Sequence, residues 1–455
     1  MIATGVFLAV VSAQLALVAA CGTDIPFHDQ WNIEGQWLYP AWRDGSLTLA
    51  GLLQPFNEHR IFWTHLLNLE LFATNGQWDP LVQLVTIAVL RAGCAAGLAW
   101  YLAKLWKWSG GIAIAVGVVI AFLPLLAWHN VLWGIESHAY FALGFSLVAL
   151  ALLGADKFSP RRIVGGVAAG IAALLAMGPG ALVPVALLGL VTLRAIERRR
   201  IERAMVWPVV SVIGLLVLAV MLRTEVPAHA ALKAHGAQEF FSAATRVLGW
   251  PHFNTPFAAV AVNLPLLLVV AGRALRRRTA SGGEDFVVLV GGWSAAIGLA
   301  TAWARGGSAE LAAGVPSRYV DFIVLLPLAN LWCAVVLART AVVRWRSRAR
   351  LLAGAWGLFL LMGWLGLSAE VMRGLVLPRA RDREAPVRLV RAFQTTGNAA
   401  VFEGQPLLLV PHPNPSAVRA VLDDPRMKGA LPPSLQPEQP MGPLSRAARW
   451  LLGHQ

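Results

Sequence analysis

An aspartate near the start of a polar segment is the first residue in this 455-residue sequence whose setting suggests chemistry. Asp29 stands in Pro26-Phe-His-Asp-Gln-Trp31, shortly after an apolar stretch that runs to Cys21. A carboxylate close to the end of a membrane helix could act as a general base toward a hydroxyl acceptor at the membrane surface. The alternative is a solvated loop acid or a helix cap. Asp29 is therefore the first candidate base.

A second carboxylate follows in Phe56-Asn-Glu-His-Arg60, which places an acid, an imidazole and a guanidinium next to one another. Glu58 is the second candidate catalytic acid, and His59 is a candidate substrate contact. Arg60 could bind a phosphate through two parallel hydrogen bonds. A structural salt bridge inside the loop is the competing interpretation of this cluster.

Two further polar clusters could converge on the same site. Glu136 and His138 lie between two apolar stretches and are candidate substrate-binding residues. Arg318 and Tyr319 open another apolar stretch, at the level where a lipid phosphate would lie. Arg318 could instead extend its charge toward the headgroup layer without binding a substrate. These four residues complete the candidate site.

The elements that carry these residues are apolar stretches typical of membrane helices. The sequence is 57% hydrophobic and 14% charged, with a mean hydropathy of +0.62, whereas about a quarter of the residues in soluble domains are charged. This composition excludes an ordinary soluble protein and predicts an all-α polytopic membrane protein. The chain has no P-loop, GxGxxG or HExxH motif, so nucleotide hydrolysis and zinc proteolysis lack their usual residues. Cys21, Cys94 and Cys333 are odd in number and far apart, which predicts packing residues and neither a disulfide framework nor a CxxC site.

About eleven apolar stretches are candidates for membrane helices. Several fall short of the roughly 20 residues of a full span, notably the two beside Met177-Gly-Pro-Gly180, which could instead form a re-entrant hairpin. Arg91 is the one clear ionisable residue in the middle of a stretch, so we expect it to face the interior and pair with an acid or a substrate phosphate. The stretches cover residues 1–21, 81–103, 111–127, 139–154, 163–177, 181–193, 205–222, 257–272, 286–304, 319–338 and 351–368.

The distribution of charge predicts the orientation of these stretches. The net charge is +14, and alternate connections hold 19 basic residues with five acids, whereas the opposite connections hold seven basic residues with 12 acids. Basic loops mark the cytoplasmic side. We therefore expect a cytoplasmic amino terminus, with the loop 22–80, the loop 223–256 and the tail 369–455 outside. The positive charge is then a topology signal, and no nucleic acid partner is expected. The basic connections lie at 104–107, 157–162, 194–203, 273–278 and 339–350.

The first outer loop, 22–80, has two further features within an expected membrane domain of residues 1–368. Trp37, Tyr39 and Trp42 suit the headgroup layer, although aromatic faces also stack on sugar rings. Residues 61–72 are apolar at near-helical spacing but too few to span a bilayer, which predicts an amphipathic helix on the membrane surface. Residues 369–455 are expected to form a small extracytoplasmic region.

The topology and several short motifs resemble a known superfamily. About eleven spans, a first outer loop with an early aspartate followed by a surface helix, and an outer tail are similar to the GT-C superfamily of polytopic glycosyltransferases. A bacterial subgroup with an Asn-Glu-His-Arg first outer loop is the nearer resemblance. The motifs that carry it are Pro26-Phe-His-Asp-Gln-Trp31, Asn57-Glu-His-Arg60-Ile61, Leu132-Trp-Gly-Ile-Glu136 and Ser317-Arg-Tyr-Val-Asp321.

The resemblance implies an enzyme of the bacterial cytoplasmic membrane that moves a sugar from a polyprenyl-phosphate carrier to a hydroxyl of a glycan, lipid or protein on the outer face. It assigns the role of general base to Asp29 and implies inversion at the sugar carbon. Donor phosphate binding would fall to Arg60 and Arg318. Relatives have a second acid where this chain has Gln30, so no cofactor is expected, Glu58 is the substitute acid, and a divalent metal stays open.

Two alternatives remain at the level of sequence. A lipid-linked glycan flippase or ligase would share the topology and the lipid phosphate, but a flippase would need a cationic central cavity. A non-catalytic membrane scaffold would present its outer tail to partners, and its function would survive a change at Asp29.

Overall fold

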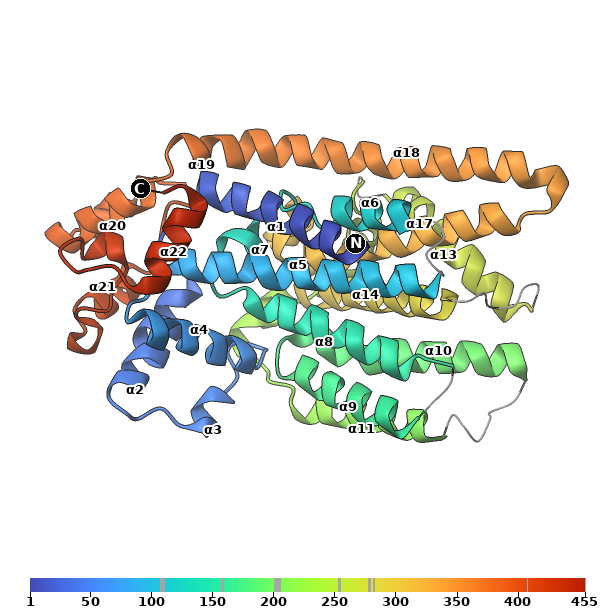
Figure 1. Ribbon diagram of the computed structural model, residues 1–455, viewed down its shortest axis with the longest axis horizontal. Coiled ribbons are helices and arrows are strands. Elements are labelled where there is room, and N and C mark those ends of the chain that lie inside the picture. The colour runs from blue at the N-terminus through green and yellow to red at the C-terminus, as the bar shows by residue number, and fades with distance from the viewer. Residues whose placement is uncertain are drawn as a thin grey trace.

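The computed structural model describes residues 1–106, 111–156, 159–199, 206–252, 255–276, 280, 283–406 and 408–454. These residues form helices and turns, with no β-strand among them. The long helices run side by side along the longest axis of the molecule, and the short helices of the first loop and of the tail gather at one end (Figure 1). Six basic residues of the expected cytoplasmic connections lie outside the described residues: Lys107, Lys157, Arg200, Arg203, Arg277 and Arg278.

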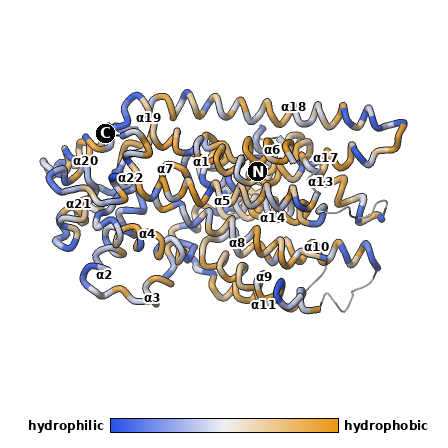
Figure 2. Tube along the Cα trace, viewed as in Figure 1, coloured by the Kyte–Doolittle hydropathy of each residue, from blue (hydrophilic) through white to orange (hydrophobic). Residues whose placement is uncertain are grey.

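Among the described residues, seven helices are long and apolar enough to cross a membrane. Three shorter apolar helices, α6 (Gly111–Ala121), α8 (Ser137–Leu153) and α11 (Val206–Met221), lie among them, and Figure 2 shows that apolar residues dominate the long helices. This confirms a helical, multi-pass architecture. The seven are α1 (Ile2–Cys21), α5 (Pro80–Leu105), α10 (Val183–Arg198) with the preceding turn η2 (Gly178–Leu182), α13 (Pro256–Ala274), α14 (Glu284–Arg305), α17 (Leu325–Thr340) with the preceding turns η5 (Ser317–Tyr319) and α16 (Val320–Ile323), and α18 (Arg346–Val371) with the flanking turns η6 (Val343–Trp345), η7 (Met372–Val376) and α19 (Leu377–Arg381).

Each of the eleven apolar stretches coincides with a helix, but a total of eleven spans stays a prediction. The helix α9 (Pro160–Leu174) has 15 residues, which at 1.5 Å per residue gives about 23 Å, short of the roughly 30 Å hydrocarbon core. The helix α6 ends at Ala121, earlier than the predicted 127, because the proline at 124 disfavours helical backbone before it. The turn η2 follows Met177 and separates α9 from α10, which is the helical pair predicted there.

Arg91 and Asp321 form an ion pair in the interior of the bundle. The Nε and Nη2 of Arg91 donate to Asp321 at 3.1 and 2.8 Å, and Nη1 donates to the carbonyl of Phe122. Asn130 and Tyr140 donate to the other oxygen of Asp321. The predicted internal pairing of Arg91 is confirmed, and every charge in the pair is compensated.

The first outer loop and the tail share one core, which we call the cap (residues 22–80 and 382–454). Buried side chains from both segments meet in it, including Trp31, Trp78, Val390 and Val421. The first loop contributes η1 (Trp31–Leu38), α2 (Tyr39–Arg43), α3 (Leu49–Leu52) and α4 (Phe62–Asn75), and the tail contributes α20 (Ala385–Thr396), η8 (Ala399–Phe402), α21 (Pro415–Leu422), η9 (Pro425–Met427), η10 (Pro433–Leu435) and α22 (Pro443–Leu452).

The cap corrects one sequence interpretation and refines another. Tyr39 is buried, stacked on Phe72, so it serves the cap core and not the headgroup layer, whereas Trp42 is exposed. The predicted helix over 61–72 is present as α4. Its buried face carries polar residues such as Thr64 and Asn68, because these bind Ser137 and Glu34.

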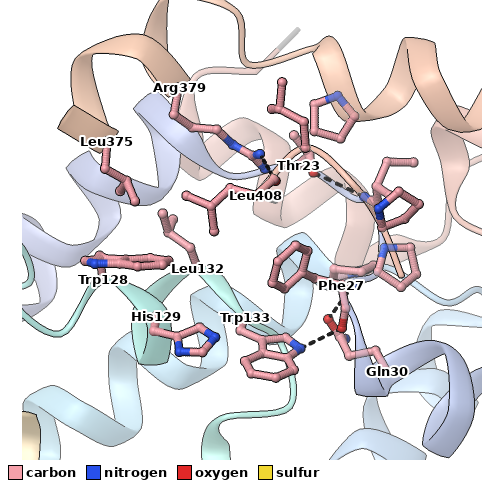
Figure 3. Close-up of a pocket in the computed structure, with 16 residues that line it drawn as sticks. Thr23, Phe27, Gln30, Trp128, His129, Leu132, Trp133, Leu375, Arg379 and Leu408 are labelled. Carbon is pink, nitrogen blue, oxygen red and sulfur yellow. Dashed lines mark hydrogen bonds between the residues drawn. The ribbon is translucent and has the colours of Figure 1, made fainter. Parts of the chain in front are cut away.

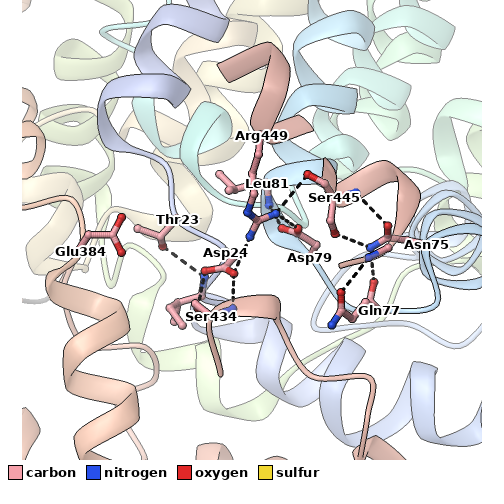
Figure 4. Close-up of polar contacts among 12 residues, drawn as sticks. Thr23, Asp24, Asn75, Gln77, Asp79, Leu81, Glu384, Ser434, Ser445 and Arg449 are labelled. Atoms are coloured by element: carbon pink, nitrogen blue, oxygen red, sulfur yellow. Dashed lines mark hydrogen bonds and ion pairs between the residues drawn. The ribbon is translucent and has the colours of Figure 1, made fainter. Parts of the chain in front are cut away.

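An arginine of the last helix joins the two ends of the first outer loop (Figure 4). Arg449 of α22 donates through Nη2 to Asp24, at 2.8 Å, and through Nη1 to Asp79. Asp24 also accepts from the backbone and the hydroxyl of Ser434. Because Asp24 follows α1 and Asp79 precedes α5, this contact fixes the base of the loop that carries Asp29.

The remaining short helices lie between the long ones and carry several site residues. They are α7 (Trp128–Leu132), η4 (Pro227–Leu232), α12 (Ala237–Leu248) and α15 (Ala309–Ala313).

Candidate functional site

The backbone around Asp29 has an uncommon conformation. His28 has a φ of +45°, in the left-handed region that side chains other than glycine seldom adopt, and its N–H donates to the carbonyl of Pro411 at 2.6 Å. The π-helix η1 follows directly, from Trp31. Strained dihedrals and π-helical turns concentrate at functional sites. The tail thus holds the segment that presents Asp29.

The Asp29 carboxylate has no hydrogen-bond or ion-pair partner in the described part of the chain. Burial raises its pKa above the ordinary value, while His412, His138, Arg318 and His229 act in the opposite direction. A carboxylate without a partner, surrounded by groups that can carry positive charge, is equipped to accept a proton.

Glu136 and His138 lie within electrostatic reach of Asp29. Glu136 directly precedes α8, is buried, and has its Oε2 at 3.4 Å from Nε2 of His138. Burial raises the pKa of Glu136 to about 8, with the charges of Asp29 and Asp321 adding to the increase and Arg318 opposing it.

Glu58 belongs to a second cluster of charged side chains, with Arg305 and His229. Its Oε1 accepts from Arg305, at 3.0 Å, and contacts Nδ1 of His229. Burial would raise the pKa of Glu58, but His229, Arg305 and His59 outweigh it and lower the pKa. The structure therefore contains a salt bridge at Glu58, although with distant residues and not inside the loop. A carboxylate held as an anion in this way is a poor proton donor.

His59, the neighbour of Glu58 in the sequence, is half-buried. Its Nδ1 accepts from the backbone N–H of Gly178 at 3.3 Å. Burial lowers its pKa to about 4, with the charges of His138 and Arg305 contributing. His59 is therefore neutral at physiological pH and links the first loop to the turn between α9 and α10.

Arg318 and Tyr319 join this set through a second arginine. The Arg318 guanidinium binds both oxygens of Glu310, at 2.6 and 2.5 Å, and lies over the ring of Tyr319. Tyr319 also interacts with Arg305, at the end of α14. Two guanidinium groups therefore meet at one tyrosine, each with an acid partner, which is an arrangement suited to a phosphate that competes for the same donors.

Arg60 is the one candidate whose charged group is engaged elsewhere. Its Nη1 donates to the carbonyl of Leu53 inside the first loop, at 2.6 Å. Arg305, and not Arg60, contacts Glu58 and Tyr319. Arg305, and not Arg60, therefore meets Arg318 at Tyr319, and phosphate binding by Arg60 stays a prediction.

The sequence interpretation missed His229, Arg305, Glu310 and His412, which come from three separate segments. His412 contacts Asn32 at 3.1 Å and belongs to the tail, to which the sequence assigned no chemistry. One signal could have found the histidines, because all ten in the chain fall in segments expected outside. Nothing comparable marks Arg305 among the many arginines of the chain.

A buried polar network supports the segment that carries Asp29. Gln30, Asn68, Trp78 and Gln83 all donate to the buried carboxylate of Glu34. Gln30 also donates to Gln83 at 2.7 Å, so the Gln30 amide serves as a structural donor.

A small cavity of about 40 Å³ lies next to this segment, between the cap and the ends of α1 and α18. Figure 3 shows Trp128, His129 and Trp133 on one side of it and Arg379 and Leu408 on the other. Phe27 and Gln30, which flank His28 and Asp29 in the sequence, line the cavity. The rings of His129 and Trp133, also in its lining, stack with their centroids 4.6 Å apart. The aromatic lining holds the site against the bundle.

Among the described residues, no group of three or more histidine, cysteine or acidic side chains is arranged to hold a metal ion. None of the three cysteines forms a disulfide bond. No protein-family model matches the chain, and no curated protein is similar to it in sequence. The argument for function therefore depends on the site itself.

Proposed function

We propose that this chain is a membrane glycosyltransferase of the GT-C type, with eleven spans, a cytoplasmic amino terminus and an extracytoplasmic carboxyl terminus in a bacterial inner membrane. It transfers a sugar from a polyprenyl-phosphate carrier to a hydroxyl group of a glycan, lipid or protein. Asp29 is the general base. The topology is supported by the alternation of basic and acidic connections and by the seven long apolar helices.

The observation that carries the proposal is the state of Asp29. Asp24, in the same loop, is neutralised by Arg449 and Ser434, whereas Asp29 has no such partner in the described part of the chain. Leaving a half-buried carboxylate unpaired has an energetic cost. A protein tolerates that cost where the carboxylate has a task, and an activated base is the task that fits its raised pKa.

The arginines supply the second requirement of sugar transfer from a lipid phosphate. Arg305 and Arg318 meet at Tyr319, and Arg318 is close enough to act on the charge of Asp29. Bidentate guanidinium groups stabilise phosphate oxygens as negative charge develops on them. A leaving phosphate held here would lie within the electrostatic reach of the base.

An apolar cavity supplies a place for the lipid chain. It has a volume of about 220 Å³ and is lined by α6, α17 and α18 together with Trp250 and Pro251. Val324 lines it, three residues after Asp321. The helix α18 leaves most of its surface uncovered by the rest of the chain, since only Ser368 is buried in it, and in Figure 1 it forms one edge of the bundle. This arrangement favours sideways entry of a lipid.

The proposed step is an inverting displacement. The acceptor oxygen attacks the anomeric carbon of the sugar while the bond from that carbon to the phosphate oxygen breaks, and the bonding electrons leave with the phosphate. Asp29 takes the proton of the acceptor hydroxyl. Arg305 and Arg318 stabilise the leaving phosphate, and no nucleotide enters the reaction.

The two alternatives have less support. A flippase needs a cationic cavity at membrane depth, but the charge of Arg91 is compensated by Asp321. A scaffold would present its tail, but the apolar residues of the tail are packed against the first loop in the cap.

The test compares Asp29→Asn with the unmodified protein in membranes supplied with labelled polyprenyl-phosphate sugars. The variant should lose transfer by about 100-fold or more, the usual contribution of a general base. Asp423→Asn is the matched control, because Asp423 is an exposed acid of the cap that pairs only with Arg419 on its own helix. Equal transfer by Asp29→Asn and the control would refute the proposal.

A further inference from the structure

The contacts of His138 define which of its nitrogens carries a proton. Nδ1 lies 2.9 Å from the carbonyl oxygen of Ile135, and a carbonyl oxygen only accepts hydrogen bonds. Nδ1 must therefore be protonated, which leaves the lone pair of a neutral imidazole on Nε2. That nitrogen faces Oε2 of Glu136 at 3.4 Å.

Two acceptors cannot face each other in a buried site without repulsion. The side chains of Glu136 and His138 are 4% and 12% exposed, so water does not screen the contact. One proton between Glu136 and Nε2 removes the conflict, whether it rests on the carboxyl or on the imidazole. The geometry of the pair therefore favours one more proton than an ionised glutamate and a neutral histidine would hold.

The charged surroundings of Glu136 favour the protonated carboxyl. Asp29 and Asp321 act on it as negative charges and Arg318 as a positive one, and Tyr140 is also within electrostatic reach. Burial is the largest influence, and the pKa of about 8 keeps the carboxyl protonated at neutral pH. Since Asp321 is already bound to Arg91, its remaining effect on Glu136 is reduced.

We propose that Glu136 and His138 hold one proton between them and that Glu136 is the general acid of the site, donating this proton to the phosphate oxygen of the departing carrier. This inference rests on the proposed glycosyl transfer. When the bond from the anomeric carbon to that oxygen breaks, its electron pair takes the proton of Glu136, while Asp29 takes the proton of the acceptor hydroxyl. The site ends with one proton on Asp29 and none on Glu136.

The pair also accounts for the return of the site to its starting state. After transfer, Asp29 is neutral and Glu136 is an anion beside neutral His138. One proton moving from Asp29 to Glu136 restores both groups, and no other reactant is needed. One protonated and one ionised carboxyl group in the same site are the usual basis of an acid and a base.

The first measurement requires no substrate. The infrared spectrum of the full-length protein in lipid vesicles at pH 7 is compared with that of Glu136→Gln. The difference spectrum should contain the C=O stretch of one buried protonated carboxyl group. Raising the pH above about 8 should convert it to the carboxylate signal. Glu70→Gln is the matched control and should retain the band, since Glu70 is exposed and accepts only from Thr74. A carboxylate signal for Glu136 at pH 7 would overturn proton sharing.

The second measurement uses labelled polyprenyl-phosphate sugar. Sugar transfer by the unmodified protein should fall as pH rises through about 8. Glu136→Gln should lower transfer by about 100-fold or more and abolish its dependence on pH, because glutamine keeps the contact with Nε2 but has no proton to give. A Glu136→Gln variant with wild-type transfer and an unchanged pH profile would overturn the acid role. If the unmodified protein transfers no sugar, the proposed function and the acid role fail together, while the infrared band still decides proton sharing.

Discussion

Replacing Arg449 by methionine should release the last helix from the first outer loop. Arg449 is the shared partner of Asp24 and Asp79, and the three side chains are 15%, 5% and 0% exposed. Methionine keeps the aliphatic length of the side chain but leaves two buried carboxylates without their cation. Removing one partner of a buried charged group costs about 3–5 kcal/mol, because the charge left behind has lost its compensation.

The loss of stability in Arg449→Met should be confined to α22 and to the two ends of the first outer loop. A loss of 3–5 kcal/mol raises the equilibrium constant for opening by about two to nearly four orders of magnitude. Hydrogen exchange followed by mass spectrometry, in detergent or nanodiscs, measures this as lost protection over residues 443–452. Arg446→Met is the matched control, since Arg446 lies one turn earlier, is exposed, and donates only to the carbonyl of Met441.

The stability that Arg449→Met loses should also depend on pH, with a defined sign. Burial already raises the pKa of Asp79 above its unfolded value, with the charge of Asp24 adding to this and Arg449 opposing it. Without Arg449 the pKa rises further, so the folded state gains stability as pH falls through that pKa. The difference between Arg449→Met and the unmodified protein should therefore be smaller at pH 5 than at pH 8. Equal protection in the Arg449 and Arg446 variants would refute the reasoning.

Three further predictions concern the packing and the topology. Gly134→Ala should lower stability by about 1–3 kcal/mol in thermal unfolding, because a Cβ there would collide with the side chains of the Gln30 network, and unchanged unfolding would contradict this packing. Asp321→Asn should reduce the yield of monodisperse protein, because it leaves the charge of Arg91 buried without compensation. The double variant Asp321→Leu with Arg91→Met should recover most of that yield, since an apolar pair costs less than an uncompensated buried charge. A double variant with a yield as poor as that of Asp321→Asn would count against this account. Ser46→Cys should react with an impermeant maleimide in intact cells and Arg346→Cys only after permeabilisation, and the reverse pattern would invert the topology.

Most helices of this protein could be predicted from local sequence. Each apolar stretch coincides with a helix because hydropathy and backbone hydrogen bonding are decided within the stretch itself. The error at α6 had a local cause too, the proline at 124. The surface helix over 61–72 was found by the same periodicity, but its buried polar face was not, because Asn68 is buried only by its contact with Glu34.

The candidate site could be predicted only in part. The structure brings three of the predicted residues, Asp29, Glu136 and Arg318, within electrostatic reach of one another, and their roles stay predictions. The contact between Arg305 and Glu58 could not be predicted, because without the fold only guanidinium groups near Glu58 in the sequence, such as Arg60, can be placed near it. Arg305 is 247 positions away from Glu58.

The sequence by itself determined the helices, through the apolar stretches, and it predicts their orientation through the charge of the connections. Only the tertiary structure decided which charged groups are compensated. Asp24 and Asp29 are the same residue type in the same loop, and no local pattern separates their roles. The last helix brings Arg449 to Asp24 across 425 positions, while Asp29 receives no such partner within the described residues. The reason is physical, because the cost of a buried charge depends on the distance to its partner in space and not along the chain.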